Sequence, residues 1–263
     1  MREQNTKVSD SQTETPGGSA RPAGTAGRAG GGGRPSPTHV TLAVVLQVRE
    51  SSLCVLLWQR GRAPFSGAWS LPGGYLEPGH ALEESIRTQL ARKVDVAELS
   101  SLEQLETVGE PDRHPDEWQL ATAYLGLVPR GLDPELPEDT AWHPVDDLPE
   151  QMAFDHGPIV LAGRERLRAK LSYTNIGFAL APQSFTMSEL SSIYTAALGY
   201  PVDPTNLRRV LERRGLLEPT GERRSPGRGG GRPAAVYRFG SHELAVTDPF
   251  AVLRPPTSGR AAG

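Results

Sequence analysis

Residues 71–96 read LPGGYLEPGHALEESIRTQLARKVDV, and this stretch decides the fold of the N-terminal half of the chain. It opens with a glycine pair, Gly73 and Gly74, which is typical of a tight turn. Because every fourth residue after the turn is apolar, one face of a helix would be apolar, and we expect a helix over about Ala81–Val94, preceded by Gly79. The residues of that apolar face are Leu82, Ile86, Leu90 and Val94.

The same stretch resembles the Nudix box, G-x5-E-x7-R-E-U-x-E-E-x-G-U, in which U is aliphatic. With Gly74 at the first position, His80 replaces the first glutamate. The later glutamate positions hold Gln89 and then two cations, Arg92 and Lys93. Nudix hydrolysis needs clustered carboxylates, because Mg²⁺ takes oxygen ligands while it neutralises the diphosphate. We therefore expect no catalytic residue and no metal site, and a pocket that binds a nucleoside diphosphate without hydrolysing it.

The composition limits the class of protein. At 263 residues the chain has room for two domains. It has no apolar run of roughly 18 residues and no apolar signal-peptide segment near its start, so we expect a soluble cytoplasmic protein without a membrane partner. The single cysteine, Cys54, excludes a disulfide within the chain and a cysteine zinc site. We expect its thiol to be buried and inert.

Residues 1–37 are rich in glycine, proline and arginine and have almost no apolar side chains, so we expect them to be disordered. Apolar runs beyond them predict strands. Residues 142–149 and 153–156 resemble the closing segment of Nudix domains, which implies a last helix over about His156–Lys170. This order favours the α/β class and a Nudix-like α/β/α sandwich, with an effector-binding domain over residues 38–155 and a linker helix over 156–172. The expected strands are His39–Val48, Leu53–Trp58, Leu102–Val108 and Gln119–Val128.

The chain after Tyr173 predicts a helix-turn-helix. The run Thr186–Glu189 fits a capping box, which opens a helix that ends at Gly199. The pair Asp203–Pro204 supplies an N-cap and a proline at the first helical position, so a second helix starts there and ends before Gly215. Two helices joined by a short turn are typical of DNA-binding domains.

A wing is expected after the second helix. Residues 216–217 begin a strand, residues 218–231 form an arginine- and glycine-rich turn, and Ala234–Phe239 returns as a second strand. The sequence therefore predicts a winged helix-turn-helix domain over residues 173–245. A flexible tail is expected over residues 246–263.

The second helix presents a polar face that suits DNA. Leu207, Val210 and Leu211 share one face and should pack inward, which leaves arginines and hydrogen-bonding side chains on the other face. Over Thr205–Arg238 arginine outnumbers acidic residues nine to three, an excess that favours phosphate contact. The expected DNA-contacting residues are Thr186, Ser188, Thr205, Asn206, Arg208, Arg209, Arg213, Arg223, Arg224, Arg228 and Arg232.

Together these segments resemble the Nudix-related transcriptional regulators of NAD metabolism, the NrtR family, over about Thr38–Phe239. The resemblance implies a homodimeric repressor that binds a double-stranded DNA operator of NAD biosynthesis or salvage genes. It also implies that the Nudix-like domain senses ADP-ribose or a related nucleotide and requires no cofactor. The matching runs are Gly61–Trp69 with Leu71–Gly74, Tyr173–Ile176, Phe185–Leu190, Gly231–Pro233 and Tyr237–Phe239.

The resemblance further implies the residues of the effector pocket. Arg60 and Arg62 would hold the diphosphate, because arginine matches phosphate in a bidentate fork. Independently of the resemblance, the residue type makes Trp69 and Trp118 candidates to stack on an adenine, although buried tryptophan is at least as common. Arg113 is a further candidate, in a run that lacks the second arginine of relatives. With the backbone of the glycine turn, the expected ligand-binding residues are Arg60, Arg62, Trp69, Gly73, Gly74 and Arg113.

Two other functions remain compatible with the sequence. One is an active Nudix pyrophosphatase that acts on ADP-ribose or NADH, with Mg²⁺ bound by displaced acids such as Glu77, Glu83 or Glu84. Turnover with added Mg²⁺ would distinguish it. The other is a non-enzymatic interaction module whose basic C-terminal part contacts an acidic protein. Such a module would not prefer its own upstream DNA over a random duplex.

Overall fold

The computed structural model describes residues 36–93, 99–225 and 233–248, which all belong to one compact unit, Ser36–Gly263. The segment expected to be disordered, residues 1–37, lies outside the described residues except for its last two. In the described ranges, no helix is both long enough and apolar enough to span a membrane.

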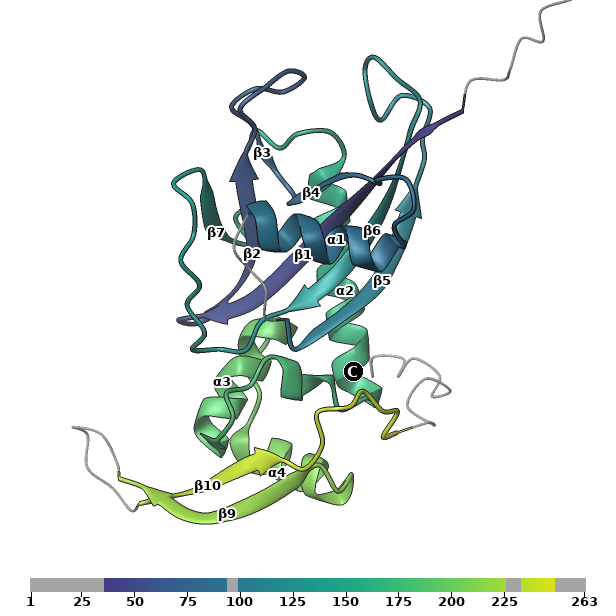
Figure 1. Ribbon diagram of the computed structural model, residues 1–263. Coiled ribbons are helices and arrows are strands. Elements are labelled where there is room, and N and C mark those ends of the chain that lie inside the picture. The colour runs from purple at the N-terminus through teal and green to yellow at the C-terminus, as the bar shows by residue number, and fades with distance from the viewer. Residues whose placement is uncertain (1–35, 94–98, 226–232, 249–263) are drawn as a thin grey trace, which may run out of the picture. The chain divides into compact units, whose positions relative to one another are not determined.

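In the part of the chain that the structure describes, seven strands form a mixed sheet in the N-terminal domain (Figure 1). They are β1 (Thr38–Arg49), β2 (Ser52–Gln59), β3 (Trp69–Ser70), β4 (Gly73–Tyr75), β5 (Ser101–Val108), β6 (Gln119–Leu127) and β7 (Thr140–Pro144). The main path is β3-β2-β1-β6-β5, while β4 pairs with β1 and β7 pairs with β2. β1 and β2 form an antiparallel hairpin, whereas β1 and β6 run parallel.

Two helices, α1 (Leu82–Lys93) and α2 (His156–Tyr173), cover opposite faces of this sheet (Figure 1). Successive side chains on a strand point to opposite faces. Accordingly, Ala43 and Val45 of β1 pack in the cluster that contains α1 residues, and Val44 packs in the cluster that contains α2 residues. The central strand is therefore buried on both faces, and the expected α/β/α sandwich is confirmed.

The longer expected elements are confirmed, with boundaries that differ by at most three residues. The largest difference is at α2, which continues past Lys170 to Tyr173. Val94, the expected last residue of the box helix, lies outside the described residues. The strands β3, β4 and β7 were not expected, because they are too short to produce an apolar periodicity.

The C-terminal domain is a winged helix with a small antiparallel sheet in the order β8-β10-β9. Its elements are η1 (Ile176–Ala179), β8 (Phe185–Thr186), α3 (Met187–Leu198), α4 (Pro204–Arg213), β9 (Leu217–Arg224) and β10 (Ala234–Phe239). The turn expected over residues 218–231 is wrong in its first half, because β9 continues through Arg224 and pairs with β10. Most β9 side chains are exposed polar groups, so the strand has no apolar pattern.

The starts of both C-terminal helices have the capping that the sequence predicts. Thr186 Oγ1 accepts a hydrogen bond from the Glu189 N–H at 3.3 Å, and the Glu189 carboxylate accepts one from the Thr186 N–H at 2.7 Å. Asp203 Oδ1 accepts from the Asn206 N–H at 2.7 Å. Gly199 ends α3 in the left-handed conformation, with φ 78°. The capping box and the end of α3 at Gly199 are therefore confirmed.

The end of α2 binds the segment that follows the wing. The Tyr173 carbonyl accepts hydrogen bonds from the Thr247 N–H at 2.8 Å and from the Asp248 N–H at 3.0 Å. Residues 246–248, which the sequence assigned to a flexible tail, are thus hydrogen-bonded to the linker helix. Residues 249–263 lie outside the described residues.

Candidate ligand pocket and nucleic-acid interface

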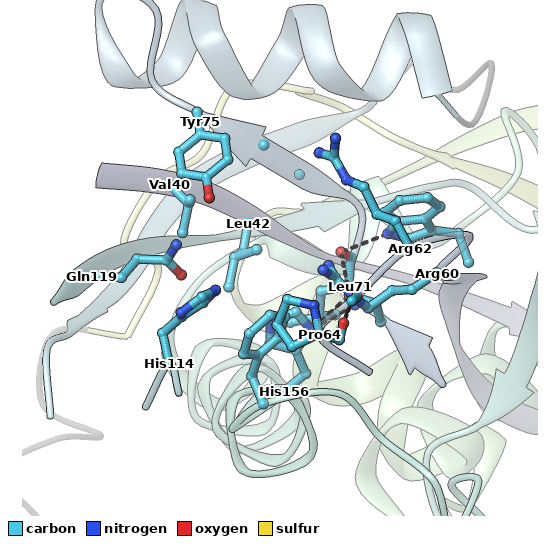
Figure 2. Close-up of a pocket in the computed structure, with 16 residues that line it drawn as sticks. Val40, Leu42, Arg60, Arg62, Pro64, Leu71, Tyr75, His114, Gln119 and His156 are labelled. Atoms are coloured by element: carbon cyan, nitrogen blue, oxygen red, sulfur yellow. Dashed lines mark hydrogen bonds between the residues drawn. The ribbon is translucent and has the colours of Figure 1, made fainter. Parts of the chain in front are cut away.

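A cavity of about 280 Å³ lies beside β4 at the N-terminal end of α2 (Figure 2). Residues of β1, β2 and β4, the segment after β2 and the loop that precedes α2 surround it. Among the described residues that line it, none is an Asp or a Glu. Of the six residues that the sequence assigned to ligand binding, the four that line the cavity are Arg60, Arg62, Gly73 and Gly74.

Arg60 and Arg62 provide the positive charge of the pocket. Arg60 Nε donates to the Pro64 carbonyl at 2.9 Å, and its guanidinium lies 4.8 Å from the centre of the Phe154 ring. Burial lowers the pKa of Arg60 from its ordinary value, and the charge of Arg62 lowers that pKa further. Within the described part of the chain neither arginine forms an ion pair with an acid. The pocket therefore carries two cations that repel one another.

His156, the first residue of α2, is among the residues that line the pocket (Figure 2), and no sequence pattern marked it as a functional residue. Its Nδ1 lies 3.0 Å from the Leu71 backbone nitrogen and 3.0 Å from the Ser70 hydroxyl. Burial lowers the pKa of His156 to about 3. The ring is therefore neutral at physiological pH.

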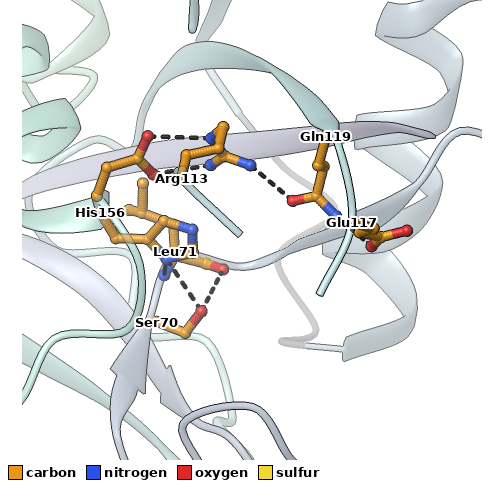
Figure 3. A network of polar contacts seen from close by, with 7 residues as sticks. Ser70, Leu71, Arg113, Glu117, Gln119 and His156 are labelled. Carbon is orange, nitrogen blue, oxygen red and sulfur yellow. Dashed lines mark hydrogen bonds and ion pairs between the residues drawn. The ribbon is translucent and has the colours of Figure 1, made fainter. Parts of the chain in front are cut away.

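Arg113 was expected to bind the ligand, and the structure places it outside the lining of the pocket. Its Nη2 and Nε donate to the two carboxylate oxygens of Asp155 at 2.7 and 3.0 Å, and its Nη1 donates to Gln119 Oε1 at 2.6 Å (Figure 3). The Arg113 side chain is only 1 % exposed. A buried guanidinium must be fully paired, and the side-chain hydrogen bonds of Arg113 go to Asp155, the residue before α2, and to Gln119, which lines the pocket.

Trp69 was expected to stack on a base, and it also lies outside the lining. Its ring packs edge-on against His143, with centroids 4.3 Å apart, and its backbone is bonded to the loop that precedes α2. Among the described lining residues, the aromatic rings are those of Trp58, Tyr75, His114, Phe154 and His156. Residues from distant parts of the chain supply these rings, so local sequence did not identify them.

Tyr75 and Gln119 form a polar edge of the pocket. Tyr75 Oη and Gln119 Nε2 both donate to Glu117 Oε1, at 2.8 and 2.9 Å. The hydrogen bond to Glu117 raises the pKa of Tyr75 above its ordinary value. Glu117 is thus engaged by two neutral donors, outside the residues that line the cavity.

The box residues lie on or beside α1. A Cβ on Gly74 would come within 2.7 Å of the Gln89 side-chain amide, so the glycine allows α1 to approach β4. Arg92 Nη1 lies 3.7 Å from Glu77 Oε1, and Arg87 pairs with Glu83 at 3.0 Å. In the described residues, no three His, Cys, Asp or Glu side chains gather in a way that would bind a metal.

The exposed face of α4 has the composition that the sequence predicts. Leu207 and Leu211 are buried, and the opposite side chains are exposed. Arg209 Nη2 donates to Asn206 Oδ1 at 2.8 Å, which holds these two side chains together. Arg208 instead pairs with Glu212 at 2.7 Å. The expected DNA-contacting residues exposed on this helix are Thr205, Asn206, Arg208, Arg209 and Arg213.

Thr186 is the expected DNA contact that the geometry disfavours. It is 6 % exposed and its hydroxyl is engaged with Glu189 in the capping box, so it has no free hydrogen-bonding group for a phosphate. Ser188 and Arg223 are exposed. Arg224 Nη1 lies 2.6 Å from both carboxylate oxygens of Glu189. Arg228 and Arg232 lie outside the described residues.

Comparison with known proteins agrees with this two-part organisation. Residues 37–162 match the NUDIX domain model, and residues 177–239 match the model of the NrtR DNA-binding winged helix domain. The chain is 30 % identical over 211 residues to the ADPR responsive transcriptional repressor NtrR of Acinetobacter baylyi, covering 78 % of this chain and 83 % of the relative. The chain belongs to the NrtR family.

A solved NrtR structure has the same arrangement of elements. The structure of Shewanella oneidensis NrtR complexed with a 27mer DNA is 33 % identical, with a TM-score of 0.65, and covers 76 % of this chain and 92 % of that chain. The Nudix part is also similar to an ADP-ribose pyrophosphatase of Methanocaldococcus jannaschii. That similarity is 29 % over 112 residues, 40 % of this chain and 63 % of the pyrophosphatase.

Proposed function

We propose that this NrtR protein is a transcriptional repressor whose Nudix domain binds ADP-ribose or a related NAD-pathway nucleotide and whose winged helix binds an operator. The observation that carries the proposal is a pocket whose described lining residues include two arginines and no Asp or Glu, joined through α2 to a domain with an exposed basic helix. The relatives support it, since one is named as ADPR responsive and another forms a complex with DNA.

The charge of the pocket fits a diphosphate. Arg60 and Arg62 repel one another in the free protein, and a bound dianion would neutralise both charges. Arginine is suited to this because its fork of N–H groups matches phosphate oxygens. The rings of Tyr75 and Phe154 add the apolar surface on which a sugar or a base can pack. This combination favours a nucleoside diphosphate over a simple anion.

We infer that the ligand is bound without hydrolysis and without a metal cofactor. Gln89 and Arg92 occupy positions at which the Nudix box has glutamates, and the cation of Arg92 lies near Glu77. Glu83 is already paired with Arg87. Two of the three displaced acids that a hydrolase would use are thus beside a positive charge, which opposes Mg²⁺ binding.

For the operator, we infer that α4 contacts base edges and that the wing contacts phosphates. Asn206 and Arg209 combine an amide with a guanidinium, the groups that pair with adenine and guanine in the major groove. Arg223 lies on β9, away from that pair in sequence, and suits a phosphate contact. We assign the operator to NAD biosynthesis or salvage genes, and the repressor to the cytoplasm.

We infer further that the repressor is a homodimer that the ligand releases from DNA. Two winged helices would bind half-sites about 34–36 Å apart, so a small displacement of one domain would break simultaneous contact. The pocket lies at the start of α2 and the winged helix follows its end. Ligand binding that moves α2 would therefore move the DNA-binding domain. A tenfold release requires only about 1.4 kcal/mol of differential binding.

Fluorescence anisotropy of a labelled duplex from upstream of the NAD biosynthesis genes tests the proposal, with a scrambled duplex as control. At fixed salt, we expect selective binding that ADP-ribose weakens. A parallel incubation of ADP-ribose with the protein and Mg²⁺, analysed by chromatography, should yield no AMP. Selective binding that ignores ADP-ribose would refute this effector, no selectivity would refute the repressor, and AMP release would favour the pyrophosphatase.

A further inference from the structure

His156 combines three features that the proposed function does not use. It is 3 % exposed, it lines the ligand pocket, and it is the first residue of α2. Both hydrogen bonds of its ring end at Nδ1. No protein partner of the other ring nitrogen, Nε2, is found among the described residues. This ring nitrogen, beside a cavity, is therefore available for a hydrogen bond to a ligand.

The contacts of Nδ1 determine the tautomer of His156. A backbone N–H can only donate, so the Leu71 amide at 3.0 Å requires a lone pair on Nδ1. A neutral imidazole with a lone pair on Nδ1 carries its proton on Nε2. Burial has the largest effect on the pKa of His156 and lowers it. Of the charged groups that act on the ring, Asp155 raises this pKa, whereas Arg113 and Arg60 lower it further. The ring is thus fixed as a neutral Nε2–H donor.

We propose that the Nε2–H of His156 donates a hydrogen bond to an oxygen of the bound nucleotide, and so brings the ligand into direct contact with the first residue of α2. This inference rests on the proposed function, since it concerns the same pocket. A donor that cannot become an acceptor selects a phosphate or ribose oxygen over an amine. It also adds no positive charge, so it recognises the ligand without increasing the repulsion between Arg60 and Arg62.

The contact would link the ligand to the DNA-binding domain through α2. The first residue of the helix would bind the nucleotide, and its last turn binds the C-terminal domain. The Ser172 carbonyl accepts from Arg214 Nη2 at 2.5 Å, and the Tyr173 carbonyl accepts from the Thr247 N–H at 2.8 Å. Loss of the donor should therefore weaken both ligand affinity and ligand-driven release of DNA.

Two amide substitutions test the roles of the two ring nitrogens of His156 one at a time. In His156→Asn the side-chain oxygen can still accept at the Nδ1 position while the Nε2 donor is lost. In His156→Gln the amide can donate near the Nε2 position while the Nδ1 acceptor is lost. Calorimetry should find ADP-ribose affinity reduced about tenfold in the asparagine variant, or about 1.4 kcal/mol, and reduced less in the glutamine variant. Thermal unfolding should show the reverse order. His80→Asn, at a histidine outside the pocket lining, is the matched control and should change neither.

The tautomer has its own spectroscopic signature. In ¹⁵N-histidine NMR of the full chain, His156 should appear as the Nε2–H tautomer, and the Nε2 shift should change on binding. An Nδ1–H tautomer, or an Nε2 signal unchanged by saturating ligand, would overturn the inference. So would equal ligand affinity in wild type and the asparagine variant.

Titration with inorganic diphosphate distinguishes this inference from the proposed function. If wild type binds diphosphate but not ADP-ribose, the effector assignment fails, and the His156→Asn comparison is then made with diphosphate. A tenfold loss there supports the donor, and an equal affinity overturns it. If neither compound binds, both proposals fail.

Discussion

Arg60 and Arg62 are close enough to lower the pKa of Arg60, and no acid in the pocket lining offsets their charge. Arg62→Ala should lower ADP-ribose affinity about tenfold to a hundredfold, because one hydrogen bond from a charged group contributes roughly 1.5–3 kcal/mol. Calorimetry would measure the loss. Arg87→Ala, at an exposed arginine paired with Glu83 on α1, is the control. An unchanged affinity in Arg62→Ala would remove this residue from diphosphate binding.

Arg113 should matter for stability more than for binding. Arg113→Ala leaves the Asp155 carboxylate without its partner, and we expect the free energy of unfolding to fall by roughly 2–4 kcal/mol. This is less than for a fully enclosed pair, because the Asp155 side chain is 26 % exposed. Urea denaturation checks the value. Asp155→Asn and the double variant complete a cycle, and additive losses would show that the ion pair is not the cause.

For single residues, the sequence identified those that lie close to one another along the chain. Arg60 and Arg62 line the pocket, as the resemblance implied, and the glycine turn packs against α1, as its place directly before that helix predicts. Arg113 and Trp69 lie outside the lining because a sequence pattern does not say which side of a loop or of a short strand faces the cavity. His156 was missed because its role depends on Leu71, which is far from it in sequence.

Among the elements, α4 combines two buried leucines with an exposed polar face. Arg209→Ala should leave the fold intact, since the side chain is exposed, and should weaken operator binding by about 1–3 kcal/mol. Anisotropy with the operator and with single-base variants of it would locate the affected position. Asn206→Ala should affect the same position, because Asn206 orients Arg209. If Arg209→Ala binds the operator as wild type does, α4 does not read its sequence.

The wing should behave differently from α4. Arg223 is exposed on β9. Arg223→Ala should weaken binding to operator and scrambled duplex alike, and should reduce the slope of log affinity against log salt by about 0.9, the value for one phosphate contact. A salt titration measures this slope. An effect confined to the operator would contradict the phosphate assignment.

The predictability of an element depended on its length and burial. In the part of the chain that the structure describes, the long strands of the Nudix sheet and the helices α1, α3 and α4 followed from apolar patterns and capping residues, whereas α2 followed from the resemblance to the closing segment of Nudix domains. The short strands β3, β4 and β7 form only because neighbouring strands offer hydrogen bonds to them. The sequence predicted too short a strand for β9 for a related reason. A wing strand with exposed polar side chains is stabilised by pairing and not by burial.

For the whole molecule, buried His156 makes stability depend on pH. The unfolded chain binds a proton at this histidine below about pH 6.5, whereas the folded protein does so only near pH 3. Because the unfolded state takes up more protons, the free energy of unfolding should fall as the pH drops below 6.5, by up to about 1.4 kcal/mol per unit. Urea denaturation at pH 7 and pH 5 measures this. His156→Asn should have a shallower dependence, and an equal slope would exclude His156 as its source.

The order of the two domains along the chain was predictable, whereas the way they are joined was not. Two capping signals and an apolar pattern that changes after Tyr173 are local features. The contacts between the last turn of α2 and residues 246–248 join segments that are more than 70 residues apart, and no local pattern predicts them.

The winged-helix segment leaves the linker helix at Tyr173, and it returns to that same residue when Thr247 and Asp248 bond to the Tyr173 carbonyl. The domain is held elsewhere too, because Arg130 Nη1 of the Nudix part donates to Ser192 Oγ of α3 at 2.8 Å, and Arg168 Nε of α2 donates to the Ala197 carbonyl at 3.3 Å. A clamp with several fastenings does not let its load turn freely about one of them. A displacement of α2 would therefore carry the DNA-binding domain with it as one body.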